Sequence, residues 1–209
     1  MYEPPLFRQS DLAELHGLIR AYPLGLIVTH GAGGLTANAI PFLVDASASP
    51  NGTLLAHLAR ANAQLADLRE ASEALVVFQG AQHYVSPAWY PTKGETHKVV
   101  PTWNYLIVQA RGKPRVIEDA PWLRAQIAAL TASREAGREA PWSVDDAPAD
   151  FIEQQMRAIV GLEIEIADIR GKWKASQNRT EADRAGVVIG LLGEDSEDAH
   201  DMAKVVGGE

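Results

Sequence analysis

The sequence predicts an α+β fold that is mainly β: an antiparallel barrel with helical additions. Two observations support this class. Short apolar or alternating runs are joined by hairpin turns such as His30–Gly34 and Asn51-Gly52. The linkers in this region are too short for the helical crossovers that parallel strands need. Residues 162–169 show the pattern most clearly, because isoleucine and leucine alternate with Glu163 and Glu165, as in a half-buried antiparallel strand.

The other elements follow from the same periodicities. Ser10 or Asp11 can cap a first helix, whose leucine-rich inner face ends before Tyr22-Pro23. Pro41 lies inside a predicted strand and must therefore be at an edge or a bulge. The predicted strands are 24–29, 35–44, 53–59, 74–79, 82–86, 98–109, 114–117 and 162–169. The further predicted helices are 62–69, 122–135, 148–160 and one that begins at residue 178.

Residues 1–192 are expected to form a single domain, because 46% hydrophobic content is ample for a packed core in 209 residues. Residues 193–209 are acidic and weakly patterned. We expect them to form a C-terminal tail that frays or packs loosely.

The composition excludes several classes of function. With 27 acidic and 19 basic residues the formal charge is −8, which opposes direct binding to nucleic acid. The absence of cysteine rules out disulfides and thiolate chemistry. No apolar run approaches the roughly 20 residues of a membrane helix, and the N-terminus does not resemble a signal peptide. A cytoplasmic protein without membrane contact is therefore the expectation.

The run from Lys172 to Arg179 is the most informative stretch, because it combines three cations, an aromatic residue and several amide or hydroxyl groups. Asn178 suits the N-cap of a helix, and Glu181 falls at the reciprocal capping-box position. The positive end of that helix, reinforced by Lys172 and Lys174, would form a site for phosphate or another anion. A solvated basic turn that caps an ordinary helix is the alternative.

Three other clusters, at 57–62, 86–90 and 100–105, mix aromatic and hydrogen-bonding residues. Arg60 and Asn62 lie where a predicted strand is followed by a predicted helix. At this position a guanidinium can bind a phosphate through paired hydrogen bonds. The alternative for Arg60 is a surface ion pair, and the alternative for Asn62 is a helix cap. For the aromatic residues the alternative is packing in the core or at a dimer interface. The six histidines lack the spacing of a metal site, so no metal is expected.

Together these motifs resemble the PaiB family of bacterial proteins. The resemblance runs from residue 1 to about residue 192. It rests on His57-x-Ala-Arg60-Ala-Asn62, Tyr84-Val-Ser86-Pro-x-Trp89-Tyr90, Val100-Pro-Thr102-Trp103-Asn104-Tyr105, Gly161-x-Glu163 and Lys172-Trp-Lys174-x-Ser176-Gln177-Asn178. It implies a split β-barrel, a homodimer, an FMN site at the dimer interface, and a negative transcriptional regulator linked to sporulation and protease genes.

The resemblance carries ten candidate cofactor-binding residues onto this chain. They are Arg60, Asn62, Ser86, Trp89, Thr102, Trp103, Asn104, Lys174, Gln177 and Asn178. Two positions depart from the family pattern. Ala39 stands where a histidine is common, and Ala63 replaces a common proline. Both changes leave the barrel intact but affect the region expected to hold flavin.

The sequence therefore favours a dimeric FMN-binding protein that regulates transcription indirectly. One alternative is an FMN-dependent oxidoreductase of the flavin-reductase or pyridoxamine-phosphate-oxidase-like class. Another is a haem-binding split barrel in which His57 or His83 is the axial ligand. No residue pattern identifies a substrate or a catalytic group.

Overall fold

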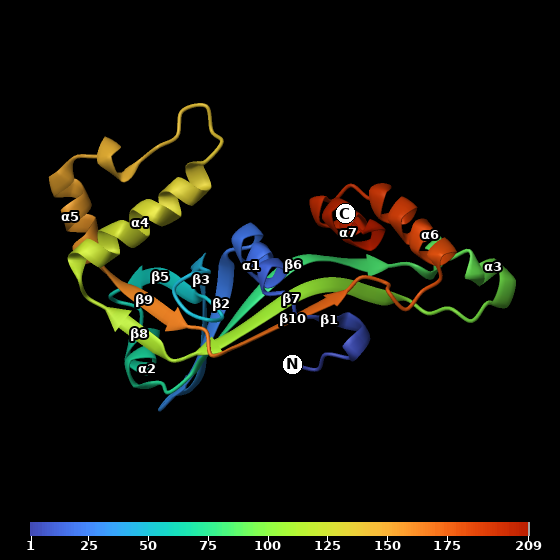
Figure 1. The fold of residues 1–209 in the computed structure, drawn as a ribbon, viewed down its shortest axis with the longest axis horizontal. Helices are drawn as coiled ribbons and strands as arrows, with labels where there is room; N and C mark the ends of the chain where they lie inside the picture. Colours follow the sequence, from blue (N-terminus) through green and yellow to red (C-terminus); the bar gives the residue numbers. More distant parts are fainter. Residues whose placement is uncertain (209) are drawn as a thin grey trace. The chain divides into compact units, whose positions relative to one another are not determined.

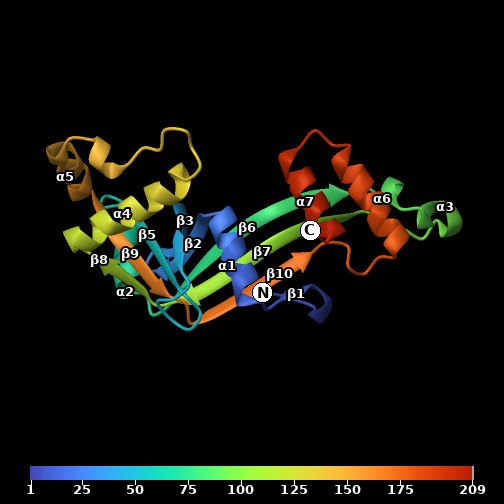
Figure 2. The same ribbon diagram turned by 45° about the horizontal axis from the view of Figure 1, so that its top comes forward.

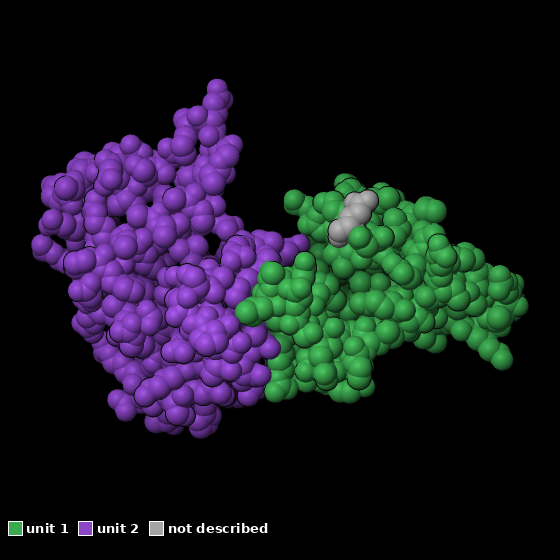
Figure 3. Space-filling view, in the orientation of Figure 1, with its two compact units in different colours: residues 1–15, 79–108, 170–209 green, residues 16–78, 109–169 purple. Residues whose placement is uncertain are grey.

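A computed structural model describes residues 1–208. Within them the chain forms seven α-helices and ten strands, and the strands make two antiparallel sheets (Figure 1). The predicted α+β class with an antiparallel barrel is confirmed. The chain divides into two compact units: of the described residues, unit 1 comprises 1–15, 79–108 and 170–208, and unit 2 comprises 16–78 and 109–169 (Figure 3). That residues 1–192 form a single domain stays a prediction.

The centre of unit 2 is a four-stranded sheet in the order β4-β5-β9-β8. Its strands are β4 (Leu43–Asp45), β5 (Thr53–Ala59), β9 (Ile159–Glu165) and β8 (Pro114–Ile117). In β5 and β9, buried Leu54 and Ala56 lie opposite buried Ile164 and Leu162. Helices α4 (Ala120–Glu135) and α5 (Ala149–Arg157) contact β9, with η3 (Val144–Asp146) between them (Figure 1).

The second sheet of unit 2 contains β2 (Leu24–Gly31), β3 (Gly34–Pro41) and the first part of β6 (Ala74–Val85). Strand β2 pairs with both neighbours, so that Leu26 lies opposite Ala39 on one side and Val77 on the other. Pro41 ends β3, which is the last strand in the sheet order, so the expected edge position is confirmed. The remaining helices here are α1 (Leu12–Ala21), which begins in unit 1, and α2 (Gln64–Glu70).

Unit 1 contains the strand order β1-β10-β7-β6. Strand β1 (Arg8–Gln9) follows the short turn η1 (Pro5–Phe7) and pairs with β10 (Asp168–Lys174), and β7 (Thr102–Gly112) comes next. Between β6 and β7 lie η2 (Pro87–Trp89) and α3 (Thr92–Thr96). Helices α6 (Glu181–Leu192) and α7 (Glu197–Gly207) pack side by side (Figure 2).

Two sequence predictions about elements were wrong. Thr180, and not Asn178, is the N-cap of α6, because the Thr180 hydroxyl accepts a hydrogen bond from the Asp183 N–H. Ser176 has a left-handed backbone (φ 62), so the chain is still turning at residues 176–179. The predicted fraying tail is instead α7, which buries Met202 and Val206.

Strand boundaries differ as well. The predicted strands 74–79 and 82–86 merge into one long strand, β6, which ends at Val85, and the predicted strand at 98–109 begins only at Thr102. Strand β10 was not predicted, because its cationic residues hide the apolar alternation that marks a strand. No helix within residues 1–208 is long and apolar enough to cross a membrane.

A buried glutamine ties α2 to the β2–β3 hairpin. Gln64 is 1% exposed, and its amide group donates to the Ile27 and Thr36 carbonyls and to the Thr29 hydroxyl. Its side-chain oxygen accepts a hydrogen bond from Asn38 (2.9 Å). Because a buried amide is tolerated only when its polar atoms are paired, this network fixes where the segment after Asn62 lies.

Candidate functional site

Two lysines on β10 bring positive charge together in unit 1. Lys172 and Lys174 are two residues apart on one strand, so their side chains leave the same face. The Lys172 ammonium lies 5.1 Å from the ring centroid of Tyr105 and 5.4 Å from that of Tyr2. Neither lysine forms an ion pair with any carboxylate among residues 1–208. The two ammonium groups are therefore not neutralised by a carboxylate of the described residues, and that they hold an anion stays a prediction.

The ammonium of Lys174 is held in place by β7. It donates to the Thr102 hydroxyl (2.5 Å) and to the Trp103 carbonyl (2.8 Å). Burial lowers the pKa of Lys174 from its usual 10.5, Tyr105 raises it, and the neighbouring charge of Lys172 lowers it further. Because burial disfavours the ammonium, an anion placed here would gain from an attraction that water screens only in part.

An exposed aromatic pair lies on the adjacent strands. Trp103 is 50% exposed, and its indole N–H donates to the side-chain oxygen of Gln82 (2.5 Å). The Tyr84 ring meets it edge-on, with ring centroids 6.1 Å apart. The hydrogen bond and the ring contact fix the indole while leaving half of it open. A planar ring system could stack on such a surface.

Asn104, Gln177 and Asn178 lie in the same unit but differ in their surroundings. Asn104 is fully buried; its amide group donates to the Ser176 hydroxyl (2.9 Å), and its side-chain oxygen has no partner. Gln177 closes the turn after β10 by bonding the Ala175 N–H and the Trp173 carbonyl. Asn178 is exposed. Asn104 and Gln177 therefore shape the turn beside the lysines.

Ser86 and Trp89 have structural roles in this fold. The Ser86 hydroxyl caps η2 by accepting from the Ala88 N–H (3.2 Å). Trp89 stacks on His83 and lies so close to α6 that a Cβ on Gly190 would meet its ring at 2.2 Å. The packing of Trp89 against α6 agrees with the core-packing alternative, and whether Ser86 or Trp89 also contacts flavin stays a prediction.

Arg60 and Asn62 belong to unit 2. The Arg60 guanidinium donates to Glu118 (3.1 Å) and to the Arg157 carbonyl, and Arg69 shares the same Glu118. Hydrogen bonding to Arg60 lowers the pKa of Glu118. The side chain of Asn62 accepts from the Gln64 N–H (3.0 Å) at the start of α2. Both residues thus match the ion-pair and cap alternatives, while two guanidiniums on one carboxylate leave a local positive charge.

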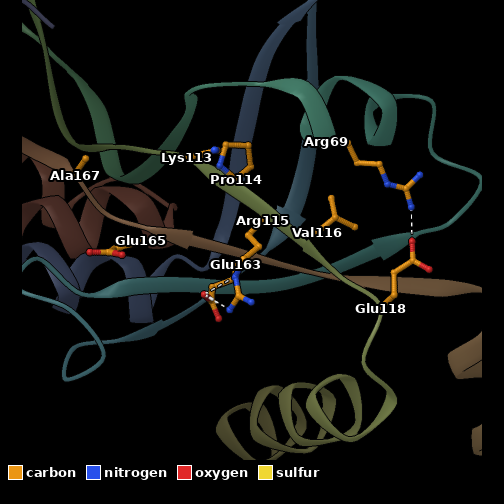
Figure 4. Close-up of a pocket in the computed structure, with 9 residues that line it drawn as sticks. All are labelled: Arg69, Lys113, Pro114, Arg115, Val116, Glu118, Glu163, Glu165 and Ala167. Atoms are coloured by element: carbon orange, nitrogen blue, oxygen red, sulfur yellow. Dashed lines mark hydrogen bonds and ion pairs between the residues drawn. The ribbon is translucent and has the colours of Figure 1, made fainter.

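A cleft in unit 2 is a weaker candidate. It encloses about 680 Å³ beside β8 and β9, and Figure 4 shows its charged residues. Arg115 pairs with Glu163 opposite it across the two strands, and Arg69 pairs with Glu118 (Figure 4). Its three cations face three carboxylates, as on an ordinary solvated sheet surface. We assign it no ligand.

The histidines do not gather around a metal. No group of three or more histidine or carboxylate side chains suited to a metal ion occurs within residues 1–208. Nδ1 of His57 lies 2.8 Å from the Gln126 side-chain oxygen, and Nδ1 of His83 lies 2.7 Å from the Tyr84 carbonyl. These contacts orient both rings, and haem ligation by either one stays a prediction.

Gln82 and Tyr105 were not among the ten candidates. Tyr105 stood inside a quoted motif, but only the fold places its ring beside both lysines. Gln82 had no signal in the sequence, because a lone glutamine on a strand is ordinary. Its role comes from two contacts. Its side-chain oxygen accepts from the Trp103 indole, and its amide group donates to Asp198 of α7 (3.3 Å).

Known proteins resemble this chain along most of its length. The model of a family described as "Putative FMN-binding domain" matches residues 1–168. An uncharacterized protein of Emericella nidulans is 36% identical, with 94% of this chain and 93% of that protein covered. The Bacillus subtilis protein named protease synthase and sporulation protein PAI 2 is 29% identical, with 99% and 96% covered.

Solved structures support the fold. The FAD and heme binding protein from Mycobacterium smegmatis matches with a TM-score of 0.62 and 19% identity, covering 85% of this chain and 78% of that one. A flavocytochrome from Azotobacter vinelandii matches with a TM-score of 0.61 and 14% identity, covering 86% and 75%. At these identities the likeness shows the shared fold.

Proposed function

This chain belongs to the family of FMN-binding domains whose model it matches, and from that premise we propose that it binds FMN on the lysine–aromatic face of unit 1. One observation carries the assignment. Lys172 and Lys174 hold two positive charges without a carboxylate partner; Tyr105 lies beside both, and Lys174 contacts the main-chain carbonyl of the half-exposed Trp103. FMN combines a dianionic phosphate with a planar ring, and this face offers a group suited to each.

The phosphate of FMN is assigned to the lysine pair. Lys174 is partly buried, which strengthens its attraction to an anion relative to an exposed lysine. Its hydrogen bonds to Thr102 and Trp103 hold the ammonium in position before the ligand arrives, so little side-chain entropy is lost on binding. Arg60 and Asn62 belong to unit 2, and their contact with flavin stays a prediction.

The ring of FMN is assigned to Trp103 and Tyr105. Stacking on aromatic side chains is favourable because it buries apolar surface on both partners. Gln82 and Tyr84 fix the indole of Trp103 without covering it. Thr102 is occupied with Lys174, while Asn104 and Gln177 hold the adjacent turn.

We propose further that two copies of the chain form a homodimer through the outward face of β2, β3 and β6. Leu24, Leu26 and Leu35 are exposed there, and the cross-strand neighbours of Leu24 and Leu26 are Pro41 and Ala39. By strand spacing and rise, β2 and β3 with eight residues each and the five residues of β6 in unit 2 cover roughly 350 Å². This area is about half of the surface that one partner buries in a standard interface. A face of this size is expected for the apolar core of an interface, which a polar rim surrounds.

The regulatory role is proposed as indirect. The identity to the Bacillus protein named for protease synthesis and sporulation motivates it, and the charge of −8 opposes contact with DNA. The same proposal includes a cytoplasmic location. A salt-sensitive, sequence-selective gel shift with DNA upstream of its own gene would contradict indirect action.

An FMN titration followed by flavin absorbance and fluorescence tests the main proposal. We expect saturable quenching with shifted bands at one flavin per chain. Lys174→Ala should weaken binding at least tenfold, because the phosphate loses its best-placed cation. Lys113→Ala, which removes an exposed lysine of unit 2, is the matched control and should bind as the parent does. Full affinity for FMN in Lys174→Ala would contradict the site assignment. Absence of binding by the parent protein at high micromolar FMN would contradict the proposed function.

A further inference from the structure

Helix α6 carries apolar side chains on two faces. Its inner face buries Val187 and Leu191. Its outer face carries a second apolar row with the spacing i, i+3, i+4 and i+7, which we call the α6 stripe. The α6 stripe consists of Ala185, Val188, Ile189 and Leu192.

The α6 stripe is not covered by the chain itself. Ile189 is 73% exposed and Leu192 is 58% exposed. A helix that is apolar on opposite sides normally buries both, because each exposed apolar face costs hydration free energy. The helix also lies beyond residues 1–168, the part that the family model describes. The outer face of α6 is therefore open to a partner.

A groove runs beside the stripe toward the end of α7. It encloses about 540 Å³ and is lined by Val188 and Ile189 from α6 and by Val206 and Gly207 from α7. Arg184 closes its floor by donating to the Val206 carbonyl (2.7 Å). The C-terminal end of α7 brings the negative end of its helix dipole to this groove. The groove thus offers an apolar wall, and the Arg184 guanidinium offsets the negative end of α7 there.

Carboxylates lie at both ends of the α6 stripe. Glu181 lines the groove in the first turn of α6, and Glu194 and Asp195 follow directly after Leu192. Glu194 and Asp195 are exposed and form no ion pair among the described residues. Residues 193–208 contain five acidic residues and one lysine. The two acidic ends are about 20 Å apart along the helix, which is the length of roughly 13 residues.

We propose that the α6 stripe binds a basic amphipathic helix of a partner protein. Leucine-like side chains of that helix pack on Ile189 and Leu192, and its cationic ends meet Glu181 at one end and Glu194 with Asp195 at the other. A second copy of this chain fits poorly. Two α6 helices packed together in either direction would bring these carboxylates against one another. An anionic lipid surface or a nucleic acid would be repelled for the same reason.

A designed peptide tests the surface. The probe is a fluorescein-labelled peptide of about 14 residues with leucines at i, i+3, i+4 and i+7 and lysines at both ends, and fluorescence anisotropy measures its affinity. We expect saturable binding that weakens with salt. Ile189→Glu should lower the affinity at least tenfold, while Phe151→Glu, at an exposed apolar position on α5, should leave it unchanged.

Charge and pattern are tested separately. The combined change Glu194→Gln and Asp195→Asn should lower the affinity several-fold and reduce the salt dependence. A peptide of the same composition with its leucines at alternate positions should not bind. Equal binding of both peptides, or of the parent and Ile189→Glu, overturns the proposal. So does an Ile189→Glu variant with half the mass of the parent in solution, because the stripe would then be a contact between copies.

Discussion

At the residue scale, the unpaired charge of Lys174 makes pH a probe of the flavin site. Burial lowers its pKa below 10.5, so the side chain loses its proton earlier than an exposed lysine does. Only the ammonium attracts a phosphate. We therefore expect the affinity for FMN to fall as pH rises through this lowered pKa. The Lys174→Arg variant should lack that fall, because a guanidinium stays protonated throughout the range.

The same proton affects stability with the opposite sign. Because the folded-state pKa lies below the unfolded value of 10.5, the unfolded chain binds more protons in that window, and stability contributed by Lys174 rises with pH there. FMN titrations and urea unfolding at several pH values check both directions. A parent protein whose FMN affinity follows the same pH curve as Lys174→Arg would contradict the assignment of the phosphate to this lysine.

Gln64 gives a second prediction at the residue scale. Gln64→Leu should lower the free energy of unfolding by about 2–4 kcal/mol, because buried partners on the β2–β3 hairpin lose their hydrogen bonds. Gln79→Leu, at an exposed position of β6, should change it by less than about 0.5 kcal/mol. Urea unfolding measures both. Equal stability of the two variants would mean that the network is not what anchors α2.

At the scale of elements, Trp89 and Gly190 of α6 set the packing of η2. A Cβ on Gly190 would lie 2.2 Å from the Trp89 ring, so Gly190→Ala must push η2 away from the helix. We expect the free energy of unfolding to fall by about 1–3 kcal/mol, because the added methyl group overpacks the contact. Gly17→Ala on α1 is the control. Nothing lies within 4 Å of its Cβ position, so Gly17→Ala should raise the free energy of unfolding by about 0.5–1 kcal/mol. Thermal unfolding of both variants distinguishes them, and a stable Gly190→Ala variant would refute this packing role.

The elements that the sequence predicted well are those whose burial is visible in periodicity. Strand β9 and helix α4 alternate or repeat as their buried faces require, and both were expected within a few residues. Strand β10 was missed because Lys172 and Lys174 occupy positions where a half-buried strand usually has apolar residues. Helix α7 was missed because small residues such as Ala199 and Ala203 fill its buried face.

The candidate site shows the same division. Lys174, Thr102 and Trp103 were named from the sequence, and the fold brings them into direct contact through two hydrogen bonds. Gln82 was not named, since its importance comes only from its partners on β7 and α7. Local motifs identify which residue types can bind an anion. Which of them stay unpaired depends on contacts between strands far apart in the sequence.

At the scale of the whole molecule, the exposed face of β2 and β3 leads to a prediction about mass. Leu26→Glu places a charge at the centre of this apolar face, where a partner would have to bury it. We expect the species in solution to fall from twice 22.6 kDa to a single chain, as measured by light scattering after gel filtration. Leu192→Glu, at a comparably exposed leucine of α6, should leave the mass unchanged.

Combining this variant with the FMN titration tests whether assembly and cofactor binding depend on each other. If flavin binds where two copies meet, Leu26→Glu should lose affinity for FMN although every residue of the lysine–aromatic face is intact. Lys174→Ala should show the reverse, retaining the dimer while losing FMN, because Lys174 lies on β10 and not on the β2–β3 face. Undiminished affinity in a monomeric Leu26→Glu would place the whole site within one chain. A dimeric Leu26→Glu would instead show that the copies meet through another surface, since a carboxylate cannot be buried unpaired at an interface core without a large cost.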